Sequence, residues 1–170
     1  MSSGRTMEFG GKPRQLLGNE VRVGDKAPNF TAVDLSLQNK SLADFSGKVL
    51  ILSAVPSIDT GVCDTETRRF NEIAGSLSDD VAILTVSMDL PFAQKRWCGA
   101  AGIDKVTMLS DHREGSFGKA YGVLLDEIRL FARCVFVVDK GGVVRYVELT
   151  EKIGMEPDYD KVVVAVKELL

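Results

Sequence analysis

The sequence is poor in histidine and has few cysteines, and both shortages limit the chemistry available to it. Its 170 residues include one histidine, His112, and three cysteines. A single histidine with no accompanying ligand pattern gives no convincing zinc or di-metal site, so we expect no metal. Three thiols do not make a disulfide framework, and their odd number favours functional or buried cysteines. His112, in the stretch "SDHRE", is expected to be a loop histidine without a chemical role.

Concentrated positive charge and long apolar runs are also missing. The net charge is −3, and no stretch gathers lysine and arginine into a basic face for phosphate, so we expect no nucleic-acid partner. Residues 1–18 contain no continuous apolar segment of signal-peptide type, and no run approaches membrane-spanning length. We therefore expect a cytoplasmic protein that binds no membrane, with residues 1–6 as a flexible leader.

The chain does have enough hydrophobic material for one core. Hydrophobic residues make up 45% and charged residues 26% of the sequence, as in ordinary soluble domains. No internal repeat, low-complexity segment or linker marks a boundary, and this length suits one domain. We expect residues 1–170 to form a single domain.

Apolar runs alternate with segments of helical periodicity along most of the chain. Strands are predicted at residues 30–35, 49–55, 81–88 and 106–110, with hairpins at 7–18, turning at Gly10-Gly11, and at 134–149. Helices are predicted at 63–77, from Pro91 to about residue 100, at 116–121 and at 157–170. This alternation favours an α/β sandwich, with helices on both faces of a mixed sheet.

One cysteine stands where the central strand turns into a helix. In "PSIDTGVC", Cys63 follows the buried strand and opens the next helix, and a helix N-terminus favours the thiolate that does thiol chemistry. Asp59 and Asp64 would oppose that anion, so a positive charge from elsewhere in the chain is required. Arg133, just before the apolar run "CVFVVD", is the best candidate. On position alone, Cys63 is equally consistent with a small buried filler at a helix start.

The same stretch resembles a known signature. Pro56, Thr60 and Cys63 match the Pro-x-x-x-Thr-x-x-Cys pattern of peroxiredoxins. From about Met7 to the end, further segments resemble the bacterial thiol peroxidase subfamily: "MDLPFAQKRWCGAAGI", "LSDHREGSFGKAYGV", "ARCVFVVD" and "EPDYDKVVVAVKEL". The resemblance implies a thioredoxin-like three-layer sandwich with a central mixed sheet and an N-terminal β-hairpin.

The resemblance also implies roles for the residues of the signature. Cys63 would be the peroxidatic cysteine, and Thr60 would hydrogen-bond the peroxide and the thiolate. Pro56 would shield the thiolate from water. Arg133 would supply positive charge to the thiolate and to the developing alkoxide, as a donor preorganised for the transition state.

The other two cysteines, Cys98 and Cys134, are expected to have different roles. "RWCGA" is not a thioredoxin centre, because position 101 holds alanine instead of a second cysteine. Cys98 lies on a charge-flanked helix that looks exposed, and the resemblance implies that it resolves the sulfenic acid of Cys63 through an intrachain disulfide. Cys134 has apolar neighbours and, by strand alternation, faces away from the side of Arg133, so we expect it to pack in the core.

The implied activity is an antioxidant peroxidase without a cofactor. It would reduce hydrogen peroxide and alkyl hydroperoxides, be recycled by thioredoxin, and form a homodimer. Since a disulfide needs Cα atoms within about 4.4–6.8 Å, we expect local unwinding near Cys63 and at residues 97–102 before Cys98 can bond.

Alternative functions and alternative roles for some residues stay open beside this hypothesis. A general thiol–disulfide oxidoreductase is disfavoured by the missing Cys-x-x-Cys, and a non-catalytic thioredoxin-fold module by the complete signature. Four large apolar residues fit core packing, an apolar mouth for alkyl hydroperoxides, or a dimer face: Phe92, Trp97, Leu130 and Phe131. Four charged residues after Cys63 are expected to form a solvated helix face without chemistry: Glu66, Arg68, Arg69 and Glu72.

Overall fold

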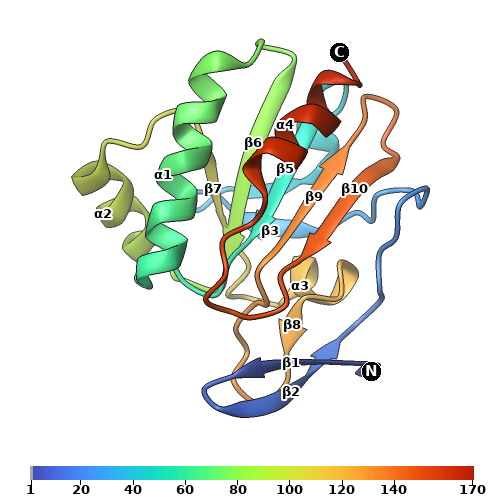
Figure 1. The fold of residues 1–170 in the computed structure, drawn as a ribbon. Helices are drawn as coiled ribbons and strands as arrows, with labels where there is room; N and C mark the ends of the chain where they lie inside the picture. Colours follow the sequence, from blue (N-terminus) through green and yellow to red (C-terminus); the bar gives the residue numbers. More distant parts are fainter. Residues whose placement is uncertain (1) are drawn as a thin grey trace.

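A seven-stranded mixed sheet forms the centre of the molecule in the computed structural model, which describes residues 2–170 (Figure 1). Its strand order is β10-β9-β5-β6-β7-β3-β4. The strands are β3 (Thr31–Val33), β4 (Asn39–Ser41), β5 (Val49–Ala54), β6 (Val81–Ser87), β7 (Thr107–Ser110), β9 (Cys134–Val138) and β10 (Val144–Leu149). The neighbours β5, β6 and β7 run parallel, while β9, β10, β3 and β4 pair antiparallel. Strand β5 is buried along its whole length, as its continuous apolar run predicts.

Helices cover both faces of this sheet, which confirms the predicted sandwich. On one face lie α1 (Gly61–Ser76), α2 (Pro91–Ala101) and α4 (Tyr159–Lys167), packed on alternate strand residues such as Ile51. Figure 1 shows α1 and α4 lying across this face. The other face, with Leu52, is covered by α3 (Ser116–Ala120) and the short 3-10 helix η1 (Leu42–Phe45). Among the described residues, no helix is long and apolar enough to cross a membrane.

An N-terminal hairpin forms a second, smaller sheet. Strands β1 (Ser2–Phe9) and β2 (Lys12–Leu17) pair antiparallel around Gly10-Gly11, both at positive φ, and β8 (Leu124–Leu125) pairs with β2. The predicted hairpin is confirmed. The segment expected to be a flexible leader overlaps β1, which begins at Ser2 and pairs with β2, and its flexibility stays a prediction; residue 1 lies outside the described residues.

Three short elements were not predicted. The strand β4 is a polar tripeptide, β8 has two residues, and η1 depends on a side-chain cap in which Asp44 accepts the Ser41 N–H at 2.7 Å. None of them is long enough to show hydrophobic periodicity. The helix α1 also begins two residues earlier than predicted, at Gly61, and α4 two residues later, at Tyr159.

Candidate active site

The chain turns from β5 into α1 through a capped loop that fixes the position of Cys63. Thr60 is the N-cap of α1, with extended backbone, and its Oγ1 accepts the N–H of Cys63 at 3.3 Å while donating to the Ser57 carbonyl at 3.0 Å. Cys63 is the third helical residue, and its side chain is fully buried. The helix N-terminus therefore points its free N–H groups and positive dipole end toward the region of the thiol.

Arg133 supplies the charge that the sequence requires from elsewhere in the chain. It immediately precedes β9, and the residue is 1% exposed. Nη1 lies 3.2 Å from Cys63 Sγ, although 70 positions separate the two residues, and Nε donates to the Ile153 carbonyl at 3.1 Å. A charged donor this close acts strongly on the sulfur because little water is present to screen it.

Glu66 is the main correction to the sequence prediction. It was expected on a solvated face, but it is fully buried, one turn after Cys63. Oε2 lies 2.6 Å from Arg133 Nη1, and Oε1 accepts the Ser53 hydroxyl at 3.0 Å. Desolvation raises the pKa of Glu66, against the opposing effects of Arg133 and Ser53. Burial works against the charge of Arg133, but the neighbouring Glu66 and Cys63 leave the pKa of Arg133 raised.

The ion pair has two opposite consequences for the thiol. It anchors the guanidinium so that a single nitrogen, Nη1, contacts both Glu66 and Cys63. It also places a negative charge near the sulfur, which offsets part of the positive potential of Arg133. The i, i+3 spacing of Cys63 and Glu66 puts both on one helix face, and this was the available sequence signal.

A second residue missed in the sequence, Asp89, holds the loop before the helix. It follows β6 and accepts the Ser57 hydroxyl at 2.7 Å, the Ile58 N–H at 2.9 Å and the Ser87 hydroxyl at 2.6 Å. A residue just after the end of β6 thus fixes the loop that follows the neighbouring parallel strand, β5. Pro56 is buried at the start of this loop, and Thr60, at its end, is exposed.

The remaining thiols lie in the two cores. Cys98 is 8% exposed and packs among the residues under α1, α2 and α4, so its expected exposure is wrong; burial raises the pKa of its thiol. Cys134 is 2% exposed and packs on the opposite face, which confirms its predicted place, and burial raises the pKa of its thiol as well. All three cysteines are free thiols. Of the four apolar residues with open roles, Phe131 is in the core, while Phe92 is 69% exposed.

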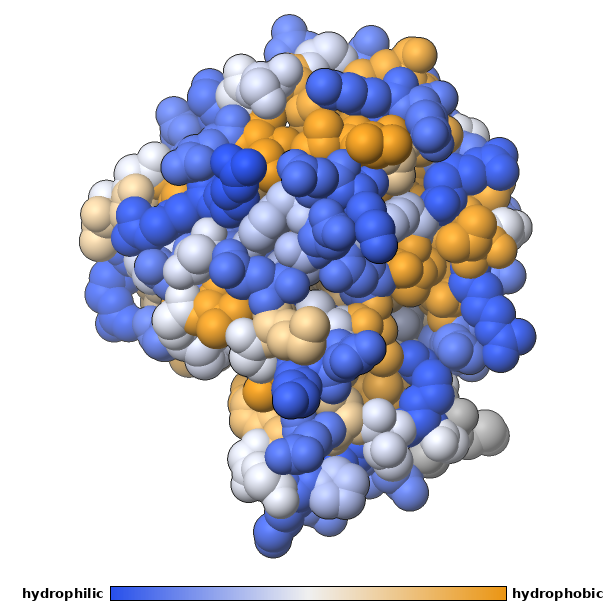
Figure 2. Space-filling view, viewed as in Figure 1, coloured by the Kyte–Doolittle hydropathy of each residue, from blue (hydrophilic) through white to orange (hydrophobic). Residues whose placement is uncertain are grey.

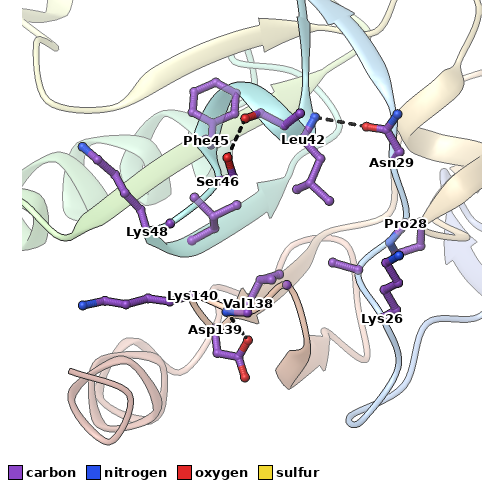
Figure 3. Close-up of a pocket in the computed structure, with 16 residues that line it drawn as sticks. Lys26, Pro28, Asn29, Leu42, Phe45, Ser46, Lys48, Val138, Asp139 and Lys140 are labelled. Atoms are coloured by element: carbon purple, nitrogen blue, oxygen red, sulfur yellow. Dashed lines mark hydrogen bonds between the residues drawn. The ribbon is translucent and has the colours of Figure 1, made fainter.

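A cavity beside the sheet lies away from these residues. A hollow of about 490 Å³ opens between η1, the β9–β10 turn and residues 26–29 (Figure 3). Leu42, Leu50 and Val138 line it, so it lies at the end of β5 and β9 remote from Ala54 and Cys134. None of the residues predicted for the site lines this cavity.

A thiol in the first turn of a helix lies beside a buried guanidinium, on a mixed sheet covered by helices on both faces, and this arrangement places the molecule among thioredoxin-like thiol redox proteins. The Redoxin family model matches residues 22–163. The thiol peroxidase of Bacillus subtilis is 57% identical over 162 residues, covering 95% of this chain and 96% of that protein. The thiol peroxidase of Halalkalibacterium halodurans is 56% identical, covering 97% and 99%.

A solved structure agrees with these relatives. The crystal structure of a peroxiredoxin-like protein from Aquifex aeolicus superposes with a TM-score of 0.91 at 45% identity, covering 98% of both chains. The chain belongs to the Redoxin family and, within it, to the bacterial thiol peroxidases. It is thus a thiol-dependent peroxidase, an oxidoreductase of the peroxiredoxin type.

Proposed function

We propose that Cys63 is the peroxidatic cysteine and that Arg133 activates it. The observation that carries this assignment is the 3.2 Å contact between Arg133 Nη1 and the buried Sγ. The Cys63 thiolate attacks the terminal oxygen of a hydroperoxide, an S–O bond forms and the O–O bond breaks, which leaves Cys63 as a sulfenic acid; the departing hydroxide or alkoxide takes a proton to become water or an alcohol. Arg133 donates to the charge that develops on that oxygen.

Thr60 and Pro56 complete the proposed site. The Thr60 hydroxyl donates to the Ser57 carbonyl, and a rotation of the O–H about the Cβ–Oγ1 bond would redirect its single proton toward a bound peroxide while Oγ1 stays in place. Pro56 is buried between β5 and the capped loop, where its apolar ring and the missing backbone N–H would limit the access of water to the thiolate.

Cys98 is proposed as the resolving thiol. Its sulfur attacks the sulfenyl sulfur of Cys63, the S–O bond breaks, and the departing hydroxide takes the thiol proton as water. A reduced thioredoxin then opens the intrachain disulfide by exchange. We propose hydrogen peroxide and alkyl hydroperoxides as substrates, and a cytoplasmic homodimer as the working form.

One coupled assay tests this function. Oxidation of NADPH is followed in the presence of thioredoxin, thioredoxin reductase and a hydroperoxide. Cys63→Ser should abolish turnover and Cys134→Ser, the matched control in the opposite core, should retain it. Full activity of the Cys63 variant would contradict the assignment. Turnover of a disulfide substrate without any peroxide would favour the general oxidoreductase instead.

A further inference from the structure

Three side chains join α1, which carries Cys63, to α2, which carries Cys98. We name them the clasp: Asp64, Arg68 and Trp97. The Trp97 indole Nε1 donates to Asp64 Oδ1 at 2.7 Å, and Arg68 Nε donates to Asp64 Oδ2 at 3.1 Å. The Arg68 guanidinium also lies 5.8 Å from the centre of the Trp97 ring and reaches the Ala101 carbonyl at 3.4 Å. The clasp residues Asp64 and Trp97 directly adjoin Cys63 and Cys98, respectively.

The first half of α2 is held in a different way. Gln94 is fully buried, and its Nε2 donates to the Ser87 hydroxyl at 3.1 Å and to the Leu109 carbonyl at 2.9 Å. These contacts anchor α2 to the ends of β6 and β7, out of reach of water. Gln94 precedes Cys98 by one turn.

The second half of α2 packs on the core through Cys98, and its polar contacts with α1 are ones that water can reach. The side chains of Asp64 and Arg68 are 34% and 48% exposed, so solvent can replace their contacts at modest cost. The helix ends at Gly102, at φ 70°, whose N–H and that of Ile103 both bond to the Cys98 carbonyl. If residues 95–102 loosen, the buried anchor at Gln94 is the point about which they separate from the core.

We propose that Trp97 is a positioning residue for disulfide formation: the clasp holds Cys98 in the core of the reduced enzyme, and opening of the clasp admits it to Cys63. This inference rests on the proposed roles of the two cysteines. The bonds that form and break are those of the resolving step given above, with no further oxidant. The clasp sets how often Cys98 is available, and therefore how long the sulfenic acid stays exposed to a second peroxide.

Trp97→Phe tests the clasp because it keeps a ring in the same place and removes the indole N–H. Loss of this hydrogen bond should accelerate Cys63–Cys98 disulfide formation about fivefold, equivalent to about 1 kcal/mol in the opening equilibrium. The first peroxide reduction should change less than twofold, and the fraction of Cys63 overoxidised at high peroxide should fall. Rapid mixing, alkylation of free thiols and mass spectrometry measure each species.

Lys95→Gln is the matched control. It lies on the same helix, is exposed, and its side chain makes no hydrogen bond or ion pair with the part of the chain that the structure describes, so both rates should stay at the wild-type values. A Trp97→Phe enzyme that forms the disulfide at the wild-type rate would overturn the clasp alone. A wild-type enzyme that forms no Cys63–Cys98 disulfide would overturn the proposed function as well.

The clasp can also be observed in the unaltered protein. Trp97 is the single tryptophan of the chain, so intrinsic fluorescence reports on its contact with Asp64. After peroxide is mixed with reduced enzyme, the fluorescence change should follow the disulfide-forming phase and be absent in Cys98→Ser. A change of equal size in Cys98→Ser would show that Trp97 responds to the first oxidation and would contradict the proposal.

Discussion

Replacing Glu66 with glutamine tests how the buried ion pair tunes the thiol. The change keeps the shape of the side chain and an oxygen to accept from Arg133, and it removes one negative charge. Sγ and Oε2 both contact Nη1, at 3.2 and 2.6 Å, so they lie no more than about 6 Å apart. At an effective dielectric constant of about 20, this separation corresponds to about 3 kcal/mol of repulsion between thiolate and carboxylate.

The assay is the rate of Cys63 alkylation as a function of pH, measured with Cys98 and Cys134 replaced by serine. Removal of the repulsion should move the midpoint of this profile in Glu66→Gln to lower pH, by about two units. Glu66→Ala is the comparison variant: it leaves the buried guanidinium without its partner and should destabilise the fold by about 3–5 kcal/mol. An unchanged midpoint in Glu66→Gln would refute the reasoning, since it would mean that Glu66 carries no charge in the native enzyme.

Three further predictions follow from neighbouring groups. Arg133→Met should move Cys63 alkylation to higher pH and slow peroxide reduction, and Arg133→Lys should restore only part of the rate because it lacks the planar fork of donors; an unchanged profile would leave the helix terminus as the source of activation. Asp89→Ala strands the Ile58 N–H and should cost about 2–3 kcal/mol in urea unfolding and lower turnover; wild-type stability would exclude this supporting role. Burial raises the pKa of Asp111 from 3.8 to about 6, so its contribution to stability is present below about pH 4 and is lost as the pH rises through about 6. Relative to Asp111→Asn, the wild type should lose about 3 kcal/mol between about pH 4 and pH 7, and a flat difference would show that the backbone N–H groups of α3 compensate for the burial.

The elements with a clear hydrophobic period could be predicted from the sequence, and the rest depend on distant partners. The strand β5 shows itself as a continuous apolar run, and α1 as a stripe at helical spacing. By contrast, β4 and β8 exist because β3 and β2 pair with them, which no local pattern reveals. Strand β1 reached further than predicted because its added residues are polar and are held by backbone pairing.

Site residues could be predicted from the sequence where the chemistry of the thiolate requires them. Residues whose role depends on burial could not. A thiolate needs a cation, so the meeting of Cys63 and Arg133 could be anticipated. Glu66 was assigned to solvent because a lone glutamate on a helix usually lies there, and its burial depends on an arginine 67 positions away. The burial of Cys98 had a weaker signal, since Pro91, Gln94 and Cys98 share one helical face.

The hydrophobic residues on the surface bear on the proposed homodimer. Figure 2 shows a mainly hydrophilic face with hydrophobic surface gathered around α4 and the C-terminal end. Val164 and Leu170 there are 55% and 52% exposed, and Phe92 on α2 is also exposed. Sedimentation of the reduced and disulfide forms would test the proposed homodimer: a sedimentation coefficient of a monomer in both would contradict it.

The central claim is that Cys63 reduces the peroxide, and it is tested most directly in a single turnover. Reduced Cys98→Ser enzyme is mixed with less than one equivalent of hydroperoxide, and the sulfenic acid is trapped with a dimedone-type reagent and located by mass spectrometry. The account predicts rapid loss of the peroxide with stoichiometric label on Cys63 and none on Cys134. Label on Cys134, or peroxide that persists in the presence of free Cys63, would contradict it.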